Sequence, residues 1–328
     1  MECNNDVIAG AKSPILHSKG NVKKSLTLKF FSGIFEYMEN LKVSVVIPTY
    51  NRKSELKKLL DALKEEEYPF SKFEVIVVDD GSQDGTKEFL ESYKSPFRLI
   101  KIVHNKNRGS AASRNDGIKA ANNEIILFLD DDLIPVPCIV SNHIKHHHIK
   151  NCAVIGNIIY RKTFNTRWVS RYLSTRGIHK IKPNKRIPFK CFWTSNASIR
   201  KEYLIKVGLF DENFKIAGGE DTEIAYRLEK NGVEFLYEKE ALCFHKPVSL
   251  SELLKKHESF AKNALPLLIK KDALFKKVFK LNLLTNPFIK LSLLPFVYCF
   301  VVALASIMNL FYLPPFIIDY LLFYKRVH

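Results

Sequence analysis

An α/β fold with a mainly parallel sheet is the fold class that this sequence predicts. Between residues 43 and 132, short apolar runs alternate with segments of helical spacing, as in successive strand–helix units. The predicted strands span residues 43–49, 73–80, 97–103 and 124–132, and the helices between them span 54–67, 86–93 and 109–121. Because these strands end in polar or acidic residues, we expect a ligand crevice at the carboxyl edge of the sheet.

Three regions are expected along the chain. Residues 1–40 should form an N-terminal tail and an amphipathic helix, which either packs on the domain or lies at a membrane interface. Residues 41–250 should form the α/β domain, whose later part includes a helix over 220–232 and a strand over 233–245. Residues 135–190 show no regular pattern. Residues 251–328 are expected to form a basic and hydrophobic helical region.

The chain is strongly basic, with 51 Lys and Arg against 34 Asp and Glu and a formal net charge of +17. Such a charge points to an anionic partner: nucleic acid, phospholipid or a phosphorylated substrate. Residues 251–328 hold 11 basic and 4 acidic residues, a net +7, beside the most hydrophobic run of the chain, which favours a membrane. Since no zinc-finger spacing, RNP-like aromatic motif or basic heptad pattern accompanies the charge, no nucleic-acid partner is expected.

The C-terminal region contains 23 residues without a charge, Leu291–Leu313. One helix of that length would measure about 34 Å, enough to cross a bilayer. Pro295, Pro314 and Pro315 near its ends keep a kinked hairpin or re-entrant segment open, and a buried helix pair is a further alternative. Because the N-terminus shows no cleavable export signal, we expect the protein at the cytoplasmic face of a membrane.

Two acidic clusters follow predicted strands. Asp79 and Asp80 close the second strand, where the turn after them would leave both carboxylates able to accept hydrogen bonds from a base or a ribose. Asp130, Asp131 and Asp132 end the fourth strand, and like charges this close are costly unless a cation neutralises them. Mg²⁺ or Mn²⁺ bound to a substrate diphosphate is the simplest such cation.

Five motifs then identify a family resemblance. They are PTYNR (48–52), VVDDGSQDGT (77–86), GSAASRNDG (109–117), LDDDLIPVP (129–137) and GGEDTEIAYRL (218–228). In this order, over roughly residues 43–245, they resemble the successive signatures of family 2 glycosyltransferases with the GT-A fold. The resemblance implies a Rossmann-like nucleotide-sugar-binding domain, followed here by the C-terminal hydrophobic helical segment.

The resemblance also implies roles for individual residues. The nucleotide would be bound by the loop after the first strand, by the first two acidic clusters and by one arginine: Pro48, Thr49, Tyr50, Asp79, Asp80, Arg114, Asp130 and Asp131. Asp130 and Asp132 match the outer positions of the DxD element, with Asp132 the first choice as metal ligand, and His245 would complete the metal or diphosphate site. Asp221 matches the catalytic base, and Glu220 would help to position donor or acceptor.

The expected function is that of an inverting, metal-dependent transferase. It would move a sugar from a nucleoside-diphosphate sugar, with UDP favoured, to a hydroxyl of a glycan or lipid-linked acceptor in cell-surface polysaccharide or glycoconjugate synthesis. The QxxRW motif of processive members is absent, so transfer of a single sugar is expected. A polyprenyl-phosphate sugar transferase and a catalytically silent membrane scaffold remain alternatives, whereas the lack of GxGxxG after the first strand argues against a dehydrogenase.

One histidine cluster is given no part in this chemistry. It is interpreted as a basic helical surface and not as a metal site, and it consists of His143, His146, His147 and His148.

Overall fold

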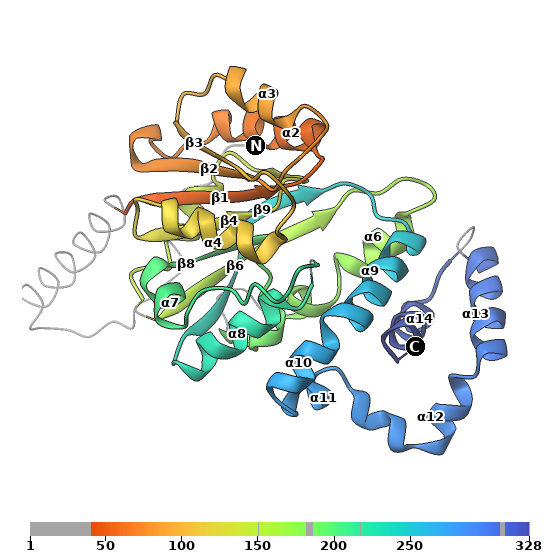
Figure 1. Ribbon diagram of the computed structural model, residues 1–328. Coiled ribbons are helices and arrows are strands. Elements are labelled where there is room, and N and C mark those ends of the chain that lie inside the picture. The colour runs from red at the N-terminus through yellow and green to blue at the C-terminus, as the bar shows by residue number, and fades with distance from the viewer. Residues whose placement is uncertain (1–40, 150, 182–185, 217, 309–311, 328) are drawn as a thin grey trace, which may run out of the picture.

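The computed structural model describes residues 41–327 except 150, 182–185, 217 and 309–311 (Figure 1). The predicted N-terminal tail and amphipathic helix, residues 1–40, lie outside the described residues.

A nine-stranded mixed sheet forms the centre of the protein, in the order β3-β2-β1-β4-β8-β6-β9-β5, with β7 also paired to β9. The first four strands in sequence are parallel: β1 Val43–Thr49, β2 Phe73–Asp79, β3 Arg98–Val103 and β4 Ile125–Leu129. The others are β5 Leu133–Pro135, β6 Cys152–Tyr160, β7 Arg186–Ile187, β8 Asn196–Arg200 and β9 Glu234–His245. β8 is antiparallel to both β4 and β6, whereas β6 and β9 are parallel.

Helices cover both faces of the sheet (Figure 1). One face packs on α2 Lys53–Ala62, α3 Thr86–Ser92 and α5 Ile139–Ile144. The other packs on α4 Ser110–Ala120, α7 Lys201–Lys206 and α8 Glu220–Lys230. Successive residues of β1 alternate between the two hydrophobic cores, with Val46 in one and Val45 and Ile47 in the other. The four parallel strands and the helices between them are therefore confirmed.

The described part of the segment without a predicted pattern contains strands β6 and β7 and helices α5 and α6 Arg167–Leu173. The apolar run at 152–160 is a strand signal that the sequence analysis missed. The interpretation of the histidine cluster as a basic surface is wrong for two of its members. His143 and His147 are buried, and burial lowers the pKa of His143 to about 4, so it packs as a neutral side chain beneath the sheet.

The C-terminal region is a chain of short helices: α9 Leu250–Asn263, α10 Leu265–Lys271, α11 Leu274–Val278, α12 Pro287–Ser292, α13 Pro295–Met308 and α14 Pro315–Val327. The uncharged stretch is not one continuous helix, because α12 ends before Pro295 and α13 starts at it; proline lacks the N–H that a continuing helix needs. Within the described part of the chain, no helix has the length and apolar character needed to cross a membrane.

Candidate active site

The loops that follow β1 and β2 are joined by hydrogen bonds at the carboxyl edge of the sheet. The backbone N–H of Asn51 donates to Ser82 Oγ at 2.8 Å, and the N–H of Gln83 donates to Asn51 Oδ1 at 2.7 Å. The N–H of Lys53 donates to Asp84 Oδ2 at 2.8 Å. These bonds hold the two loops side by side, as the crevice prediction requires.

Asp79 lies fully buried beneath these loops. Its Oδ1 accepts the N–H of Ser82 at 2.9 Å, whereas its Oδ2 has no partner among the residues that the structure describes. A buried oxygen of this kind is an acceptor available to a ligand N–H or O–H. Beside it, Pro48 is half-buried and Tyr50 is exposed, while Thr49 is buried.

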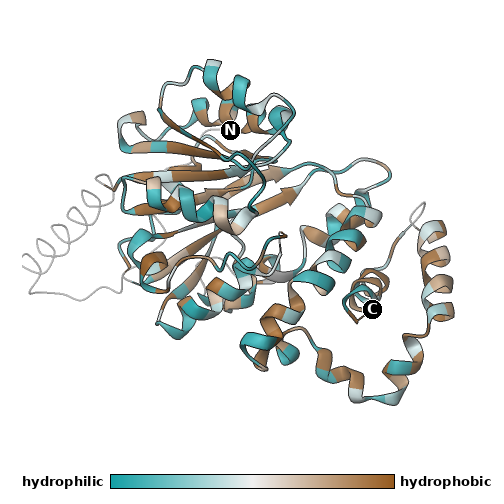
Figure 2. Ribbon diagram, in the orientation of Figure 1, coloured by the Kyte–Doolittle hydropathy of each residue, from teal (hydrophilic) through white to brown (hydrophobic). Residues whose placement is uncertain are grey.

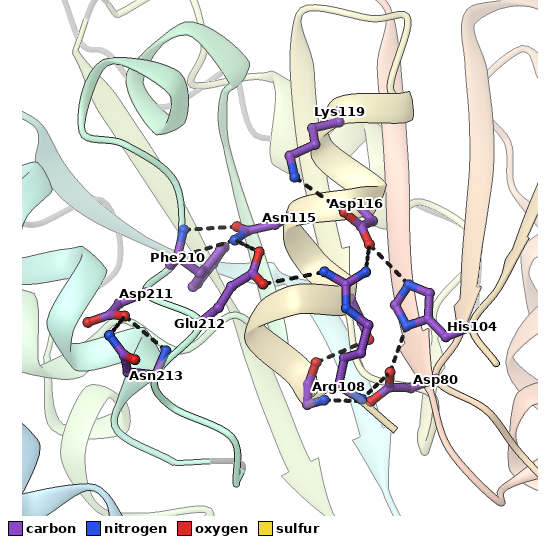
Figure 3. Close-up of polar contacts among 12 residues, drawn as sticks. Asp80, His104, Arg108, Asn115, Asp116, Lys119, Phe210, Asp211, Glu212 and Asn213 are labelled. Atoms are coloured by element: carbon purple, nitrogen blue, oxygen red, sulfur yellow. Dashed lines mark hydrogen bonds and ion pairs between the residues drawn. The ribbon is translucent and has the colours of Figure 1, made fainter. Parts of the chain in front are cut away.

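Asp80, unlike Asp79, is fully occupied by the protein itself (Figure 3). Its carboxylate accepts the backbone N–H groups of Arg108 at 2.9 Å and Gly109 at 2.8 Å, and it lies 2.7 Å from His104 Nδ1. These contacts fix the loop that begins α4. Asp80 therefore positions that loop, and its assignment to the nucleotide by the resemblance stays a prediction.

The same network continues across α4 (Figure 3). His104 Nε2 is 3.0 Å from Asp116, and Arg108 forms ion pairs with Asp116 at 2.5 Å and Glu212 at 3.4 Å. Asn115 bonds both the carbonyl and the N–H of Phe210, each at 2.9 Å. α4 is thereby attached on one side to Asp80 and His104, which follow β2 and β3, and on the other side to Phe210 and Glu212, which precede α8.

The three carboxylates after β4 each have a cationic neighbour. Asp130 accepts from Arg114 at 3.0 Å, while one nitrogen of Arg52 lies 2.9 Å from Asp131 and 2.7 Å from Asp132. Thr49 Oγ1 donates to Asp131 at 2.8 Å. Arg52, which had no predicted role, supplies the neutralising charge that this acidic cluster requires.

The two carboxylates that share Arg52 differ in pKa because their environments differ. Burial raises the pKa of Asp131 to about 6, although Arg52 and Thr49 favour its charged form. Burial alone would also raise the pKa of Asp132, but His245 and Arg52 outweigh it and hold that pKa well below its usual range. Asp132 is thus the carboxylate that stays charged across the physiological pH range.

The residues proposed to hold a metal are compatible with one. His245 Nδ1 bonds the Lys246 carbonyl at 2.7 Å, so its Nε2, 3.4 Å from Asp132 Oδ2, is left as a possible ligand. Asp130 forms its ion pair with Arg114 and not with Arg52. Among the described residues no group of three or more His, Cys, Asp or Glu side chains forms a ready metal cage.

Arg114 connects the acidic cluster to the start of α8. Its fully buried guanidinium bonds Asp130 at 3.0 Å and Glu220 at 3.0 Å, and it lies 4.0 Å from Asp221. Glu220 also accepts from Ser110 Oγ at 2.8 Å and from the N–H of Gly218 at 2.6 Å. Through these bonds Glu220 fixes the positions of Arg114, Ser110 and Gly218.

Asp221 is oriented by Thr194, which the sequence analysis did not single out. Thr194 Oγ1 donates to Asp221 Oδ1 at 2.5 Å, and its N–H donates to Oδ2 at 3.3 Å. Burial and the Glu220 charge raise the pKa of Asp221 to about 7, against the opposing effects of Arg114 and Thr194. A carboxylate with this pKa can take up and release a proton near neutral pH.

The glycines before α8 have a packing role. Gly219 has φ +92°, and a β-carbon there would lie 2.7 Å from the Ala264 side chain. A larger residue would therefore both strain the turn and push the α9–α10 junction away from α8.

A pocket lies beside β6 and the start of β8. Its lining residues come from β6, α6, the single helical turn Gly177–Lys180, the segment before β8 and the first residue of β8, and they include Tyr160, Leu173, His179 and Trp193. Tyr160 packs on His245 with ring centroids 4.8 Å apart, and Trp193 directly precedes Thr194. Two lining residues therefore connect the pocket to the candidate site, Tyr160 through its contact with His245 and Trp193 through its position next to Thr194.

The profile of the family described as "Glycosyl transferase family 2" matches residues 44–208. The glycosyltransferase AglE of Haloferax volcanii is 30% identical over 244 residues, which cover 74% of this chain and 79% of AglE. The "Uncharacterized glycosyltransferase YfnE" of Bacillus subtilis is 27% identical over 254 residues, and the match covers 62% of this chain and 64% of YfnE. The chain belongs to glycosyltransferase family 2, as the five motifs implied.

Solved structures share the fold. The mannosyltransferase PcManGT of Pyrobaculum calidifontis, in complex with GDP-Man and Mn²⁺, has a TM-score of 0.59 at 19% identity, and the match covers 93% of this chain and 98% of that one. TarS of Staphylococcus aureus has a TM-score of 0.51 at 23% identity over 67% of this chain and 39% of TarS. These likenesses confirm the mixed α/β fold of GT-A type.

Proposed function

We propose that the chain is an inverting glycosyltransferase that moves a sugar from a nucleoside-diphosphate sugar to an acceptor hydroxyl. The observation that supports this most strongly is the placement of Asp221 beside Arg114 and Thr194, with a raised pKa, on the edge of the sheet that also carries Asp79 and the acidic cluster. Retention of these residues in this geometry disfavours a catalytically silent scaffold.

Asp221 would remove the acceptor proton as the acceptor oxygen attacks the anomeric carbon from the face opposite the diphosphate. The bond to the diphosphate oxygen breaks, and its electron pair leaves with the nucleoside diphosphate. Thr194 holds the carboxylate of Asp221 in place, while Arg114 and Glu220 fix the distance between it and the acidic cluster.

A divalent cation, Mg²⁺ or Mn²⁺, would be held by Asp132 and His245 and would stabilise negative charge on the leaving diphosphate. Asp79 Oδ2 would accept from the nucleoside. The family resemblance favours UDP as the nucleotide. GalNAc-T7, whose structure was solved with UDP, GalNAc and Mn²⁺, shares the fold at a TM-score of 0.50, whereas PcManGT was solved with GDP-Man and Mn²⁺.

The direct test is a screen of nucleotide sugars with the purified full chain, with and without Mn²⁺. Acceptor-dependent release of one nucleoside diphosphate, with inverted anomeric configuration of the product by NMR, would support the proposal. If no nucleotide sugar binds or is consumed, the scaffold alternative takes its place. Using both a glycoside and a polyprenyl phosphate as acceptors separates transfer to a hydroxyl from transfer to a lipid phosphate.

The pocket beside Thr194 suits the acceptor sugar. Its lining is mainly apolar, with the indole of Trp193 41% exposed at the position next to the residue that orients the base. A sugar ring can pack its C–H face on such an aromatic surface while its hydroxyl points to a carboxylate.

Trp193→Ala is expected to raise the acceptor KM by about 10-fold, with little change in donor KM, because the lost stacking contact serves the acceptor alone. Initial rates with aryl glycosides that serve as acceptors in the screen measure this. Phe164→Ala removes an exposed aromatic side chain that does not line the pocket and is the matched control. An unchanged acceptor KM in Trp193→Ala would remove the acceptor from this pocket.

The proposal also includes a glycan or lipid-linked acceptor and a place in cell-surface polysaccharide or glycoconjugate synthesis. We further propose that the protein acts at the cytoplasmic face of a membrane. The chain charge of +17 and the basic C-terminal region support an anionic or membrane-borne partner.

A further inference from the structure

Helices α12 and α13 expose several large apolar side chains. The most exposed of them, by 60 to 80%, form what we call the outer apolar face: Phe288, Leu291, Phe296, Phe300 and Ile307. On α13 the positions 296, 300 and 307 lie on one side of the helix. Soluble surfaces seldom carry several large apolar side chains this exposed and this close together, so the face is expected to be covered by a partner.

The opposite side of α13 is already packed. Val301, Val302 and Ala305 join a hydrophobic cluster with Ile318 and Leu321 of α14, and α14 in turn contacts α9. Figure 2 shows α13 as mostly hydrophobic with paler stretches, at the edge of the molecule beyond α14. A helix of this composition with one side buried in the protein has only its outer side free for another apolar phase.

The charges between Asp272 and Asp319, the part of the sequence that carries this face, have one sign. The exposed lysines Lys276, Lys277, Lys280 and Lys290 precede or belong to α12, and no acidic residue occurs between Asp272 and Asp319. Two copies of this face brought together would set these lysines against one another. Anionic lipid headgroups would instead neutralise them while acyl chains receive the phenylalanines.

We propose that the outer apolar face docks in the plane of an anionic bilayer surface, with α13 parallel to it and its inner side retained on α14. Docking of this kind uses the helices as they are folded. It depends on residues remote from Asp132 and Asp221, so it can fail without affecting the proposed transferase activity.

Co-sedimentation of the full chain with phosphatidylcholine vesicles, with and without phosphatidylglycerol, tests the docking. The wild type is expected to bind the anionic vesicles, with binding weakened by salt. Phe296→Ser/Phe300→Ser is expected to lower the partition coefficient by about 10-fold or more, because both side chains would enter the interface. Lys276→Glu/Lys280→Glu should lower it by at least about 10-fold for anionic vesicles only.

Phe164→Ser/Ile205→Ser is the matched control, since it removes two exposed apolar residues from the α/β part of the chain, outside α12 and α13, and should bind vesicles as the wild type does. Substitutions are preferable to deletion from Leu291, which would remove α14 from its contacts with α9. Equal Tm values for all variants show that the fold is retained. The proposal would be overturned if the wild type did not bind vesicles. It would also be overturned if Phe296→Ser/Phe300→Ser bound them as strongly as the wild type. A dimer in light scattering that this variant dissociates would assign the face to a second copy instead.

Discussion

Replacing Asp221 with Asn is expected to lower turnover by about 10² to 10⁴ while donor affinity barely changes. Asparagine keeps the size of the side chain and can still accept from Thr194 Oγ1, the shorter of the two contacts. It cannot remove a proton. Because the proposed base would act in the transition state and the nucleotide would be bound at Asp79, the loss should fall on kcat.

The pH profile provides an independent readout of the same residue. A general base must be deprotonated, and the pKa of Asp221 is raised to about 7 by burial and Glu220. Turnover of the wild type should therefore rise as the pH passes about 7 and level off above it. The residual activity of Asp221→Asn should lack this rise. Loss of donor binding as severe as the loss of turnover would make Asp221 a structural residue and move the base to Glu220 or elsewhere.

Asp132→Ala is expected to abolish the gain in donor affinity that Mn²⁺ provides. Replacing residues that only support a metal ligand usually costs about 10 to 100-fold in metal affinity, and removal of the ligand itself should cost at least as much. Titration of UDP or another bound nucleoside diphosphate with and without Mn²⁺ measures the effect.

Two comparisons make this result specific to Asp132. Glu202→Ala removes an exposed carboxylate on α7, remote from the site, and should leave the Mn²⁺ dependence intact. Asp132→Ala should stay folded, because Arg52 retains Asp131 as a partner at 2.9 Å. Metal-assisted affinity equal to that of the wild type would show that the cation is held without Asp132.

Local sequence patterns predicted the central part of the fold well, since each buried parallel strand is a short apolar run and a covering helix such as α2 has its own apolar stripe. They do not show which contacts one segment makes with another. Asp80 matches a nucleotide-binding position of the family, and only the fold shows that its oxygens also contact His104, Arg108 and Gly109. Whether a carboxylate at a strand end is free for a ligand depends on which backbone N–H groups other loops bring to it.

The sequence by itself determined the parallel strands, the acidic residues at their carboxyl ends and membership of glycosyltransferase family 2. Only the tertiary structure decided that Thr194 orients Asp221, that Arg114 bridges Asp130 and Glu220, and that α13 buries one side and exposes the other. The physical reason is the range of the interactions. Strand and helix patterns arise from neighbouring residues, whereas Arg114 and Glu220 are separated by 106 positions and meet only when α4 and α8 pack on the same face of the sheet.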